Sequence, residues 1–382
     1  VVVGQAGLIR ALAILLLGKS ITTLSCLSIS AISTNMEVKG GGVYYMITRS
    51  LGPELGGAVG LTLYLAIGLS VPFYVIGFVD SLRGINAFTE FINSNYLAVC
   101  LSALGFFFFI SWVGANVALK LQFIILGILF LSIVSFMGGL IADFDVSRFT
   151  DNLSAWDSPD RSAFWLLFAI YFPAVTGMEA GVSMSGDLKD PGKSLPRGAL
   201  AAVFVGAFIY GIQMILMAGG IDRVFPDGAP GSLIHSPYRG LKNAAGVIGF
   251  LVPAGAIAAT ASSALGSFVA APRILQAIAR DDLFSILKPF AKGTLKGDEP
   301  RRALALTLGL GLATLAVAIL TSENALNAVA AVLTMFFLAS YGTVNASAFV
   351  EAFGKNPSFR PRFKYFHWLT ALTGVQIGRA HV

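Results

Sequence analysis

Long apolar runs separated by short polar links recur along almost the whole chain. A helix needs roughly 20 mostly apolar residues to cross a bilayer, so each such run predicts a membrane-spanning helix. The predicted spans are 10–36, 55–82, 95–117, 119–142, 162–185, 195–219, 244–278, 303–321 and 324–350, with a short apolar piece at 1–9 and an incomplete span from 368. The pattern predicts an all-α polytopic membrane protein in which 1–382 form a single transmembrane domain.

The two ends of the chain interrupt this pattern. The first residue is Val1, which already lies in an apolar run, and the run that begins near Trp368 stops at 377–382. We therefore expect a domain that is incomplete at both ends, in which 377–382 could be non-native.

The composition supports a membrane protein. Hydrophobic residues make up 56% and charged residues 12% of the chain, whereas soluble domains carry about 25% charged residues. So few charges cannot cover a water-facing surface. Cys26 and Cys100 both lie in apolar runs, which argues against a disulfide framework. The three histidines are scattered and form no metal-ligand cluster, so we expect no cofactor.

The basic residues indicate an orientation in the membrane. The net charge is +6, but the lysines and arginines sit in the short links between spans, so topology explains them better than a nucleic-acid partner does. One set of alternate links, which includes 37–54 and 280–302, holds most of them. The opposite links hold only Arg83, Arg148, Arg161, Arg223, Arg239 and Lys242. The richer set is predicted to be cytoplasmic, in a multi-pass protein of the cell membrane.

The predicted span 162–185 contains a break. Its middle reads FPAVTGMEAG, in which Pro173, Thr176, Gly177 and Gly181 interrupt an apolar run. Proline removes a backbone donor, and glycine lets the chain leave the helix. In transporters, such breaks form the substrate site because half-helix ends offer dipoles and free carbonyls. The alternative is an ordinary kinked span with glycines that serve packing.

Glu179 lies in the centre of this break. A carboxylate at this depth costs several kcal/mol and usually has a function, such as balancing a bound cation or carrying a proton. The alternative is a carboxylate that neighbouring half-helix amides satisfy.

Hydroxyl groups within two other spans are weaker candidates. Tyr74 lies in the middle of 55–82, and Ser262 and Ser263 lie within 244–278. Their oxygens could coordinate a hard cation such as Na⁺, but hydroxyls in membranes also bond to backbone carbonyls or mediate helix packing. Lys19, inside the first complete span, either extends to the interface or pairs with an acid. The sequence contains no arrangement typical of a hydrolase or metalloprotease, so an enzyme is not expected.

Four motifs, in order along the chain, resemble the cation–chloride cotransporter family of the amino acid–polyamine–organocation superfamily. They are STNMEVKGGGVYYMITRSLGPELGGAVGL, FPAVTGMEAGVSMSGDLKDPGKSLPRG, ASSALGSFVAAPRILQAIARDD and FFLASYGTVNASAF. The resemblance implies two inverted repeats of five helices in which the first and sixth helices are unwound around a central site. The starting VVVGQAG resembles the second half of helix one, so that helix is expected to be truncated.

The resemblance also implies three groups of ion-binding residues. They are Tyr74, Pro173 and Thr176 for potassium, Ala259, Ser262 and Ser263 for sodium, and Gly177, Met178 and Tyr341 for chloride. Glu179 stands where the family has an apolar residue beside chloride. Two like charges about 4 Å apart at an effective dielectric near 20 repel by about 4 kcal/mol, so an ionised Glu179 argues against chloride there.

These observations leave two transport functions and one function without transport open. The first is cation-coupled, secondary-active symport of inorganic ions (Na⁺, K⁺ and Cl⁻) by alternating access. The alternative is an amino acid permease driven by H⁺ or Na⁺, in which Glu179 meets a substrate ammonium group or relays a proton. A membrane sensor without transport is disfavoured by the broken helix and its acid. The expected partners are these ions or small amino acids, the lipid bilayer, and a second copy in a homodimer.

Overall fold

The computed structural model describes residues 2–35, 42–83, 85–154, 162–183, 190–222, 250–295, 297–322, 324–355, 357 and 359–379. Within these ranges the chain is helical and has no strand. Eight of the described helices are long and apolar enough to cross a membrane, which confirms the predicted all-α polytopic class.

The described helices that could span a membrane contain 18 to 34 residues. They are α1 (Val2–Asn35), α3 (Pro53–Arg83), α5 (Tyr96–Val113), α6 (Ala115–Ala142), α10 (Pro191–Gly220), α12 (Leu251–Arg280), α13 (Arg301–Thr321) and α14 (Ala325–Phe353). The shorter elements are α2 (Val43–Leu51), α4 (Asn86–Ser94), α7 (Val146–Leu153), α8 (Ser162–Tyr171), the 3₁₀ turn η1 (Phe172–Val175), α9 (Met178–Ser183), η3 (Ser285–Phe290) and α15 (Trp368–Arg379).

Most predicted spans coincide with a helix to within a few residues. The piece at 1–9 and the span 10–36 form one helix that is kinked at Gly7, whose φ of 72° suits glycine. The start of the predicted span 244–278 lies outside the described residues. The short helices α4 and α7 were not predicted, because each has only nine or eight residues and polar positions on one face.

Helix lengths recur along the chain as two repeats predict. The helices α1, α3, α5 and α6 contain 34, 31, 18 and 28 residues, and α10, α12, α13 and α14 contain 30, 30, 21 and 29. The first three of each set pack pairwise: α1 against α10, α3 against α12, and α5 against α13. The broken segment α8–η1–α9 precedes the second set, as Val2–Ala6 and the kink at Gly7 precede the rest of the first.

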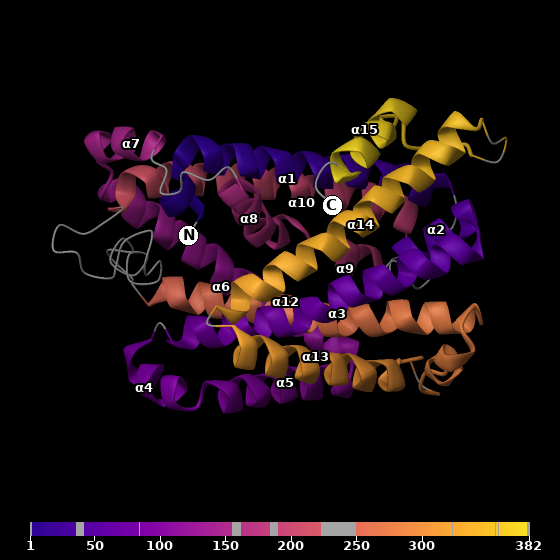
Figure 1. Cartoon of the computed structure of the whole chain (residues 1–382), viewed down its shortest axis with the longest axis horizontal. Coiled ribbons are helices and arrows are strands. Elements are labelled where there is room, and N and C mark those ends of the chain that lie inside the picture. Colours follow the sequence, from indigo (N-terminus) through magenta and orange to yellow (C-terminus); the bar gives the residue numbers. More distant parts are fainter. Residues whose placement is uncertain are drawn as a thin grey trace.

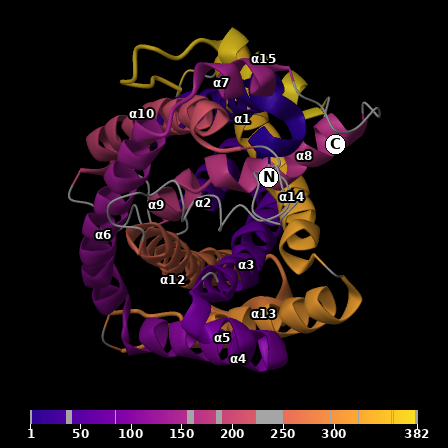
Figure 2. The same ribbon diagram turned by 90° about the vertical axis from the view of Figure 1, so that its left-hand side faces the viewer.

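Figures 1 and 2 show how these pairs are arranged. The pair α3 and α12 lies in the middle, with α1 and α10 on one side and α5 and α13 on the other. In the end-on view, α6 and α14 flank the centre, and the broken segment lies between α1, α14 and α10. The central pair therefore places α12 and α3 next to the break.

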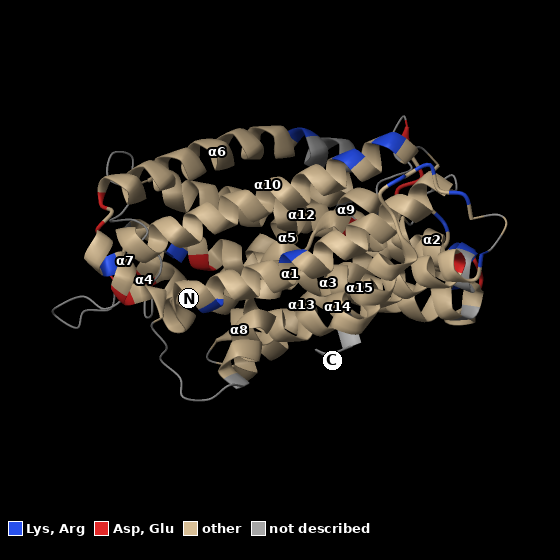
Figure 3. Cartoon of the chain, turned by 90° about the horizontal axis from the view of Figure 1, so that it is seen from above, with Lys and Arg blue, Asp and Glu red and all other residues tan. Residues whose placement is uncertain are grey.

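Outward faces of the flanking helices are apolar. Phe106 and Phe109 on α5 and Phe123 and Phe130 on α6 are 58–76% exposed. Exposed apolar surface on this scale needs an apolar solvent, which the lipid bilayer supplies. The charges gather instead at the two ends of the helices, and most lysines and arginines lie at the end that carries α2 (Figure 3). We call this the basic end; it includes Lys193 and Arg197 at the start of α10.

Candidate functional site

The predicted break in span 162–185 is present and falls at Pro173. The helix α8 ends at Tyr171, a 3₁₀ turn follows, and Thr176 is extended with φ of −88° and ψ of −178°. Gly177 has a φ of 117°, a conformation that side-chain-bearing residues rarely adopt. The chain then re-enters a helix, α9, at Met178. The proline and the glycine thus produce the interruption for the reasons that the sequence indicates.

Hydroxyl groups from other helices satisfy the carbonyls that the break leaves free. Because Pro173 has no N–H, the carbonyl of Ala169 lacks its helical donor, and Thr334 of α14 donates to it at 2.6 Å. Tyr210 of α10 donates to the carbonyl of Ala174 at 3.0 Å. The Thr176 hydroxyl donates to the carbonyl of Pro173 at 2.8 Å. The break is therefore held by α14 on one side and α10 on the other.

Glu179 is buried in the first turn of α9, with 2% of its surface exposed. Its Oε2 accepts a hydrogen bond of 3.1 Å from the amide of Gly177. Its Oε1 is buried and has no hydrogen-bond partner, and no lysine or arginine among the described residues pairs with the carboxylate. The half-helix amide thus satisfies one oxygen, and the Tyr341 hydroxyl is the side-chain group that interacts with the carboxylate from α14.

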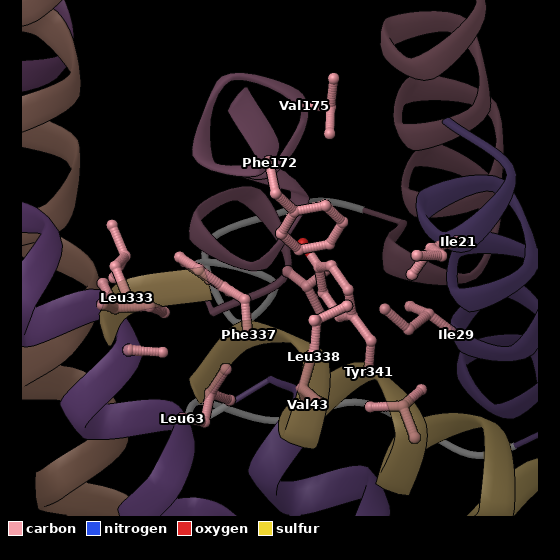
Figure 4. Packing of buried hydrophobic residues seen from close by; sticks show 14 of the residues in the cluster. Ile21, Ile29, Val43, Leu63, Phe172, Val175, Leu333, Phe337, Leu338 and Tyr341 are labelled. Atoms are coloured by element: carbon pink, nitrogen blue, oxygen red, sulfur yellow. The ribbon is translucent and has the colours of Figure 1, made fainter. Parts of the chain in front are cut away.

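Tyr341 of α14 faces this carboxylate. Its buried hydroxyl interacts with the Glu179 side chain and with the Gly177 backbone. Figure 4 shows the Tyr341 side chain extending from α14 toward Phe172 of the 3₁₀ turn, and the two ring centroids are 6.1 Å apart. The side-chain amide of Asn345, one turn further along α14, donates to the Tyr341 carbonyl at 2.9 Å and to the Ser25 hydroxyl of α1 at 3.0 Å. These bonds connect this part of α14 to α1.

Tyr74 and Ser263 complete the group around Glu179. Tyr74 of α3 interacts through its hydroxyl with the Ser263 side chain of α12, and electrostatically with Glu179 and Tyr341. We call Tyr74, Glu179, Ser263 and Tyr341 the oxygen cluster. Tyr74 belongs to the predicted potassium group, Ser263 to the sodium group and Tyr341 to the chloride group. The cluster thus joins one residue of each group to Glu179.

The other predicted residues lie around the cluster. Ala259 and Ser262 are half-buried and share a face of α12 with Ser263, because positions three and four residues apart are neighbours on a helix. Pro173 and Thr176 are bonded to each other as described above. Met178 is half-buried at the start of α9. In the part of the chain that the structure describes, no group of three His, Cys, Asp or Glu side chains could hold a metal ion.

Two residues at the break were not predicted. Tyr210 and Thr334 are polar side chains within otherwise apolar spans, which is the same signal that identifies Tyr74. The sequence does not say which mid-span hydroxyl reaches which carbonyl, because that depends on how α10 and α14 pack against the break.

A cleft of about 460 Å³ lies beside the break, between α1, α9 and α10. It is lined by Lys19, Thr22, Val175, Thr176, Gly177, Met178, Gly181, Val182, Ser194, Leu195, Gly198, Ala199, Ala202 and Val203. The ammonium nitrogen of Lys19 lies 5.3 Å from the centre of the Tyr210 ring, a cation–π distance. No carboxylate among the described residues pairs with Lys19.

Comparison with known sequences places these features in a family context. A family model described as "Amino acid permease" matches residues 1–379. Solute carrier family 12 member 2 of Squalus acanthias is 34% identical over 98% of this chain and 34% of its own length. Solute carrier family 12 member 1 of Mus musculus is 34% identical over 98% of this chain and 37% of its own length. The human member 2 is 32% identical over 98% of this chain. The chain therefore spans about a third of these relatives, and the resemblance seen in its motifs is confirmed.

Proposed function

Because the chain belongs to the amino acid permease family, we propose that it is a secondary-active transporter that couples solute movement to a cation by alternating access. The family and the eight apolar helices make it a multi-pass membrane protein. Its activity and substrates are inferred from the site, because the chain spans about a third of the solute carriers that it matches. The homodimer stays a prediction.

The oxygen cluster carries this proposal. A buried carboxylate oxygen without a partner costs free energy unless a proton or a cation satisfies it. Around Glu179 lie the hydroxyls of Tyr74 and Tyr341, and Ser263 adjoins Tyr74. Hydroxyl and carboxylate oxygens are donors that hard alkali cations prefer, and no nitrogen or sulfur ligand set is present among the described residues. The geometry therefore favours an inorganic cation over a softer ligand.

Within this proposal the predicted residues have distinct functions. Sodium would bind near Ser262 and Ser263 of α12. A second cation, potassium, would bind near Tyr74 and use the carbonyl of Pro173 and the hydroxyl of Thr176, which now bond to each other. Exchange of that internal hydrogen bond for a bound cation would couple binding to the conformation of the break.

Chloride at Gly177, Met178 and Tyr341 has less support. The Gly177 amide, which an anion would need, already donates to the Glu179 carboxylate. An anion beside that carboxylate would also face about 4 kcal/mol of repulsion at roughly 4 Å and an effective dielectric near 20.

The cleft supports alternating access. It reaches from Ser194, near the basic end, to Thr176 and Gly177 at the break. The positive-inside rule makes the basic end cytoplasmic, so the cleft would be the inward path to the break. Binding of ions would then bias the movement of one helix bundle against the other.

Uptake by the purified protein in liposomes tests the proposal. We expect ⁸⁶Rb⁺ to accumulate inside, faster with an inward Na⁺ gradient than without one. Protein-free liposomes and liposomes with a collapsed gradient are the controls. Absence of Rb⁺ uptake, together with uptake of a labelled amino acid under a Na⁺ or H⁺ gradient, would refute ion symport and identify an amino acid permease instead.

A further inference from the structure

Two buried residues with side chains of opposite charge type, Glu179 and Lys19, lie near the broken helix without forming a pair with each other. Glu179 belongs to the oxygen cluster, between α9, α14 and α3, and it occupies the Gly177 amide. Lys19 lines the cleft between α1 and α10. The first charge explains how a cation is held. The second has no function in the cation site, because its ammonium group would repel a cation.

Lys19 lies deep in the membrane domain. The helices α1 and α10 are antiparallel, since Gly192 lies beside the Ser33 carbonyl and Gly206 lies beside the Lys19 ammonium group. A methyl group built on Gly206 would lie 3.2 Å from Lys19 Nζ, so the glycine leaves room for the lysine. At 1.5 Å per residue, Gly206 is roughly 21 Å along α10 from Gly192, well inside a hydrocarbon layer of about 30 Å.

The environment of Lys19 is that of a binding group without its ligand. The residue is 9% exposed, and among the described residues its ammonium group lies over the Tyr210 ring and beside Gly206. A lysine at this depth normally pairs with an acid or marks the path of a substrate or ion. Among the described residues no acid is paired with it.

The cleft beside Lys19 has the size and the charge for a small anion. Its volume of about 460 Å³ is far larger than the roughly 10–15 Å³ that one water molecule needs by the same measure. Lys19 lies at the end that is farthest from the basic end, where Lys193 and Arg197 are exposed. Lys19 is the one charged residue among the described residues that line the cleft, and a positive charge inside a cleft attracts anions from solution. Thr22 and Thr176 also line it, and their hydroxyls donate to the carbonyls of Lys19 and Pro173.

We propose that the Lys19 cleft binds a small monovalent anion, either a halide ion or the carboxylate group of a small organic solute. Resting on the function proposed above, this anion is the one transported together with the cation. The anion is thereby assigned to the Lys19 end of the cleft and not to the position beside the Glu179 carboxylate, which already holds the Gly177 amide.

Tyr210 connects this site to the break. Its ring contacts the Lys19 ammonium group, and its hydroxyl donates to the Ala174 carbonyl in the 3₁₀ turn. An anion that draws the Lys19 ammonium group away from the Tyr210 ring would remove one of the contacts that hold Tyr210 in place against the Ala174 carbonyl. Occupancy of the cleft and the conformation of the unwound segment are therefore linked through one side chain.

Anion binding to the purified protein in detergent tests the proposal without requiring transport. Bound ³⁶Cl⁻ is measured by scintillation proximity in gluconate buffer, and unlabelled acetate is the competitor. The variant Lys19→Met, which keeps the length and removes the charge, should bind about tenfold more weakly or not at all. Lys19→Arg should bind within about threefold of the wild type. Lys288→Met is the control, because that lysine is exposed and pairs with Asp282.

A second variant is needed in case Lys19→Met fails to fold. A methyl group built on Gly198 meets no atom within 4 Å, so Gly198→Phe can fill the cleft while Lys19 is kept. It too should abolish binding. Displacement of ³⁶Cl⁻ by acetate at equal or lower concentration would identify a carboxylate ligand, and failure of acetate to compete would identify a halide.

Absence of ³⁶Cl⁻ and acetate binding by the wild type, or undiminished binding by folded Lys19→Met, would overturn the anion site. Neither result depends on ⁸⁶Rb⁺ uptake, so failure of the anion site and failure of the proposed transport function are distinguishable.

Discussion

Thr334 of α14 donates a hydrogen bond of 2.6 Å to the carbonyl oxygen of Ala169 in α8. Ala169 lies four residues before Pro173, so this is the carbonyl that the proline leaves without a helical donor. The side chain of Thr334 is 1% exposed, and water cannot easily replace it. A hydroxyl on one helix thus substitutes for a missing backbone amide on another, and it ties the broken helix to α14, which also carries Tyr341.

Replacing Thr334 by valine should destabilise the protein. Valine has nearly the same shape but cannot donate, and a buried polar group that loses its partner costs about 1–3 kcal/mol. We expect a lower midpoint of thermal unfolding in detergent, and largely restored stability in Thr334→Ser. Thr343→Val is the control, because that exposed hydroxyl bonds to its own helix at Ala339. Equal midpoints for Thr334→Val and Thr343→Val would contradict this account.

Replacing Glu179 by glutamine should weaken cation binding. The amide has the same shape, and its oxygen can still accept from Gly177, but the negative charge is gone. A full charge at about 4 Å and an effective dielectric near 20 contributes about 4 kcal/mol at most, and each 1.4 kcal/mol changes affinity about tenfold. We therefore expect the Rb⁺ concentration for half-maximal uptake to rise by about tenfold or more.

The folded state of Glu179→Gln should be at least as stable as the wild type, because an unpaired buried charge is removed. Glu90→Gln, on the exposed surface of α4, is the matched control. Unchanged Rb⁺ dependence in Glu179→Gln would mean that the carboxylate does not face the cation.

Ser262 and Ser263 should determine the dependence on sodium. The double variant Ser262→Ala, Ser263→Ala removes two hydroxyl oxygens from one face of α12 and leaves the helix intact, since alanine is the best helix former. We expect ⁸⁶Rb⁺ uptake to lose its stimulation by a Na⁺ gradient. Thr260→Ala serves as the control, because the hydroxyl of Thr260 bonds to its own helix at Ala256. Stimulation by Na⁺ that persists in the double variant would remove the sodium assignment.

The sequence alone predicted those helices and breaks that depend on residues within the same segment. Apolar runs of bilayer length predicted the spans, and Pro173 with Gly177 predicted the break, because both residues act on their own backbone. Glu179 was expected either to serve a ligand or to be satisfied by half-helix amides. The structure shows that the Gly177 amide satisfies one oxygen while the other has no partner.

The rest of the site depends on contacts between helices far apart in the chain. Nothing local to Thr334 or Tyr210 indicates that their hydroxyls reach Ala169 and Ala174. Lys19 was recognised as an unusual charge, but its cleft depends on the register between α1 and α10. Residue types predicted which side chains could take part, whereas packing decides which of them meet.

The short helix α7 should lose protection from hydrogen exchange when Asp145 is replaced. The Asp145 carboxylate caps α7 by accepting from the Ser147 hydroxyl and the Arg148 amide, and these bonds hold its pKa below the usual value of 3.8. Arg148 in turn pairs with Asp222 at 2.6 Å and donates to the Gly219 carbonyl, which joins α7 to the end of α10. Loss of the cap should therefore loosen this junction.

The effect of Asp145 should depend on pH in a defined direction. Since the folded-state pKa is depressed, the stabilisation is complete above the usual pKa and is lost as the pH falls through the lower folded value. We expect Asp145→Ala to exchange faster than the wild type over 146–153 at neutral pH, and the difference to shrink below about pH 4. Asp145→Asn, which can cap a helix without titrating, should keep most of the protection and show no such transition. A difference between Asp145→Ala and the wild type that stays constant down to about pH 3 would show that the charge of Asp145 does not stabilise the helix.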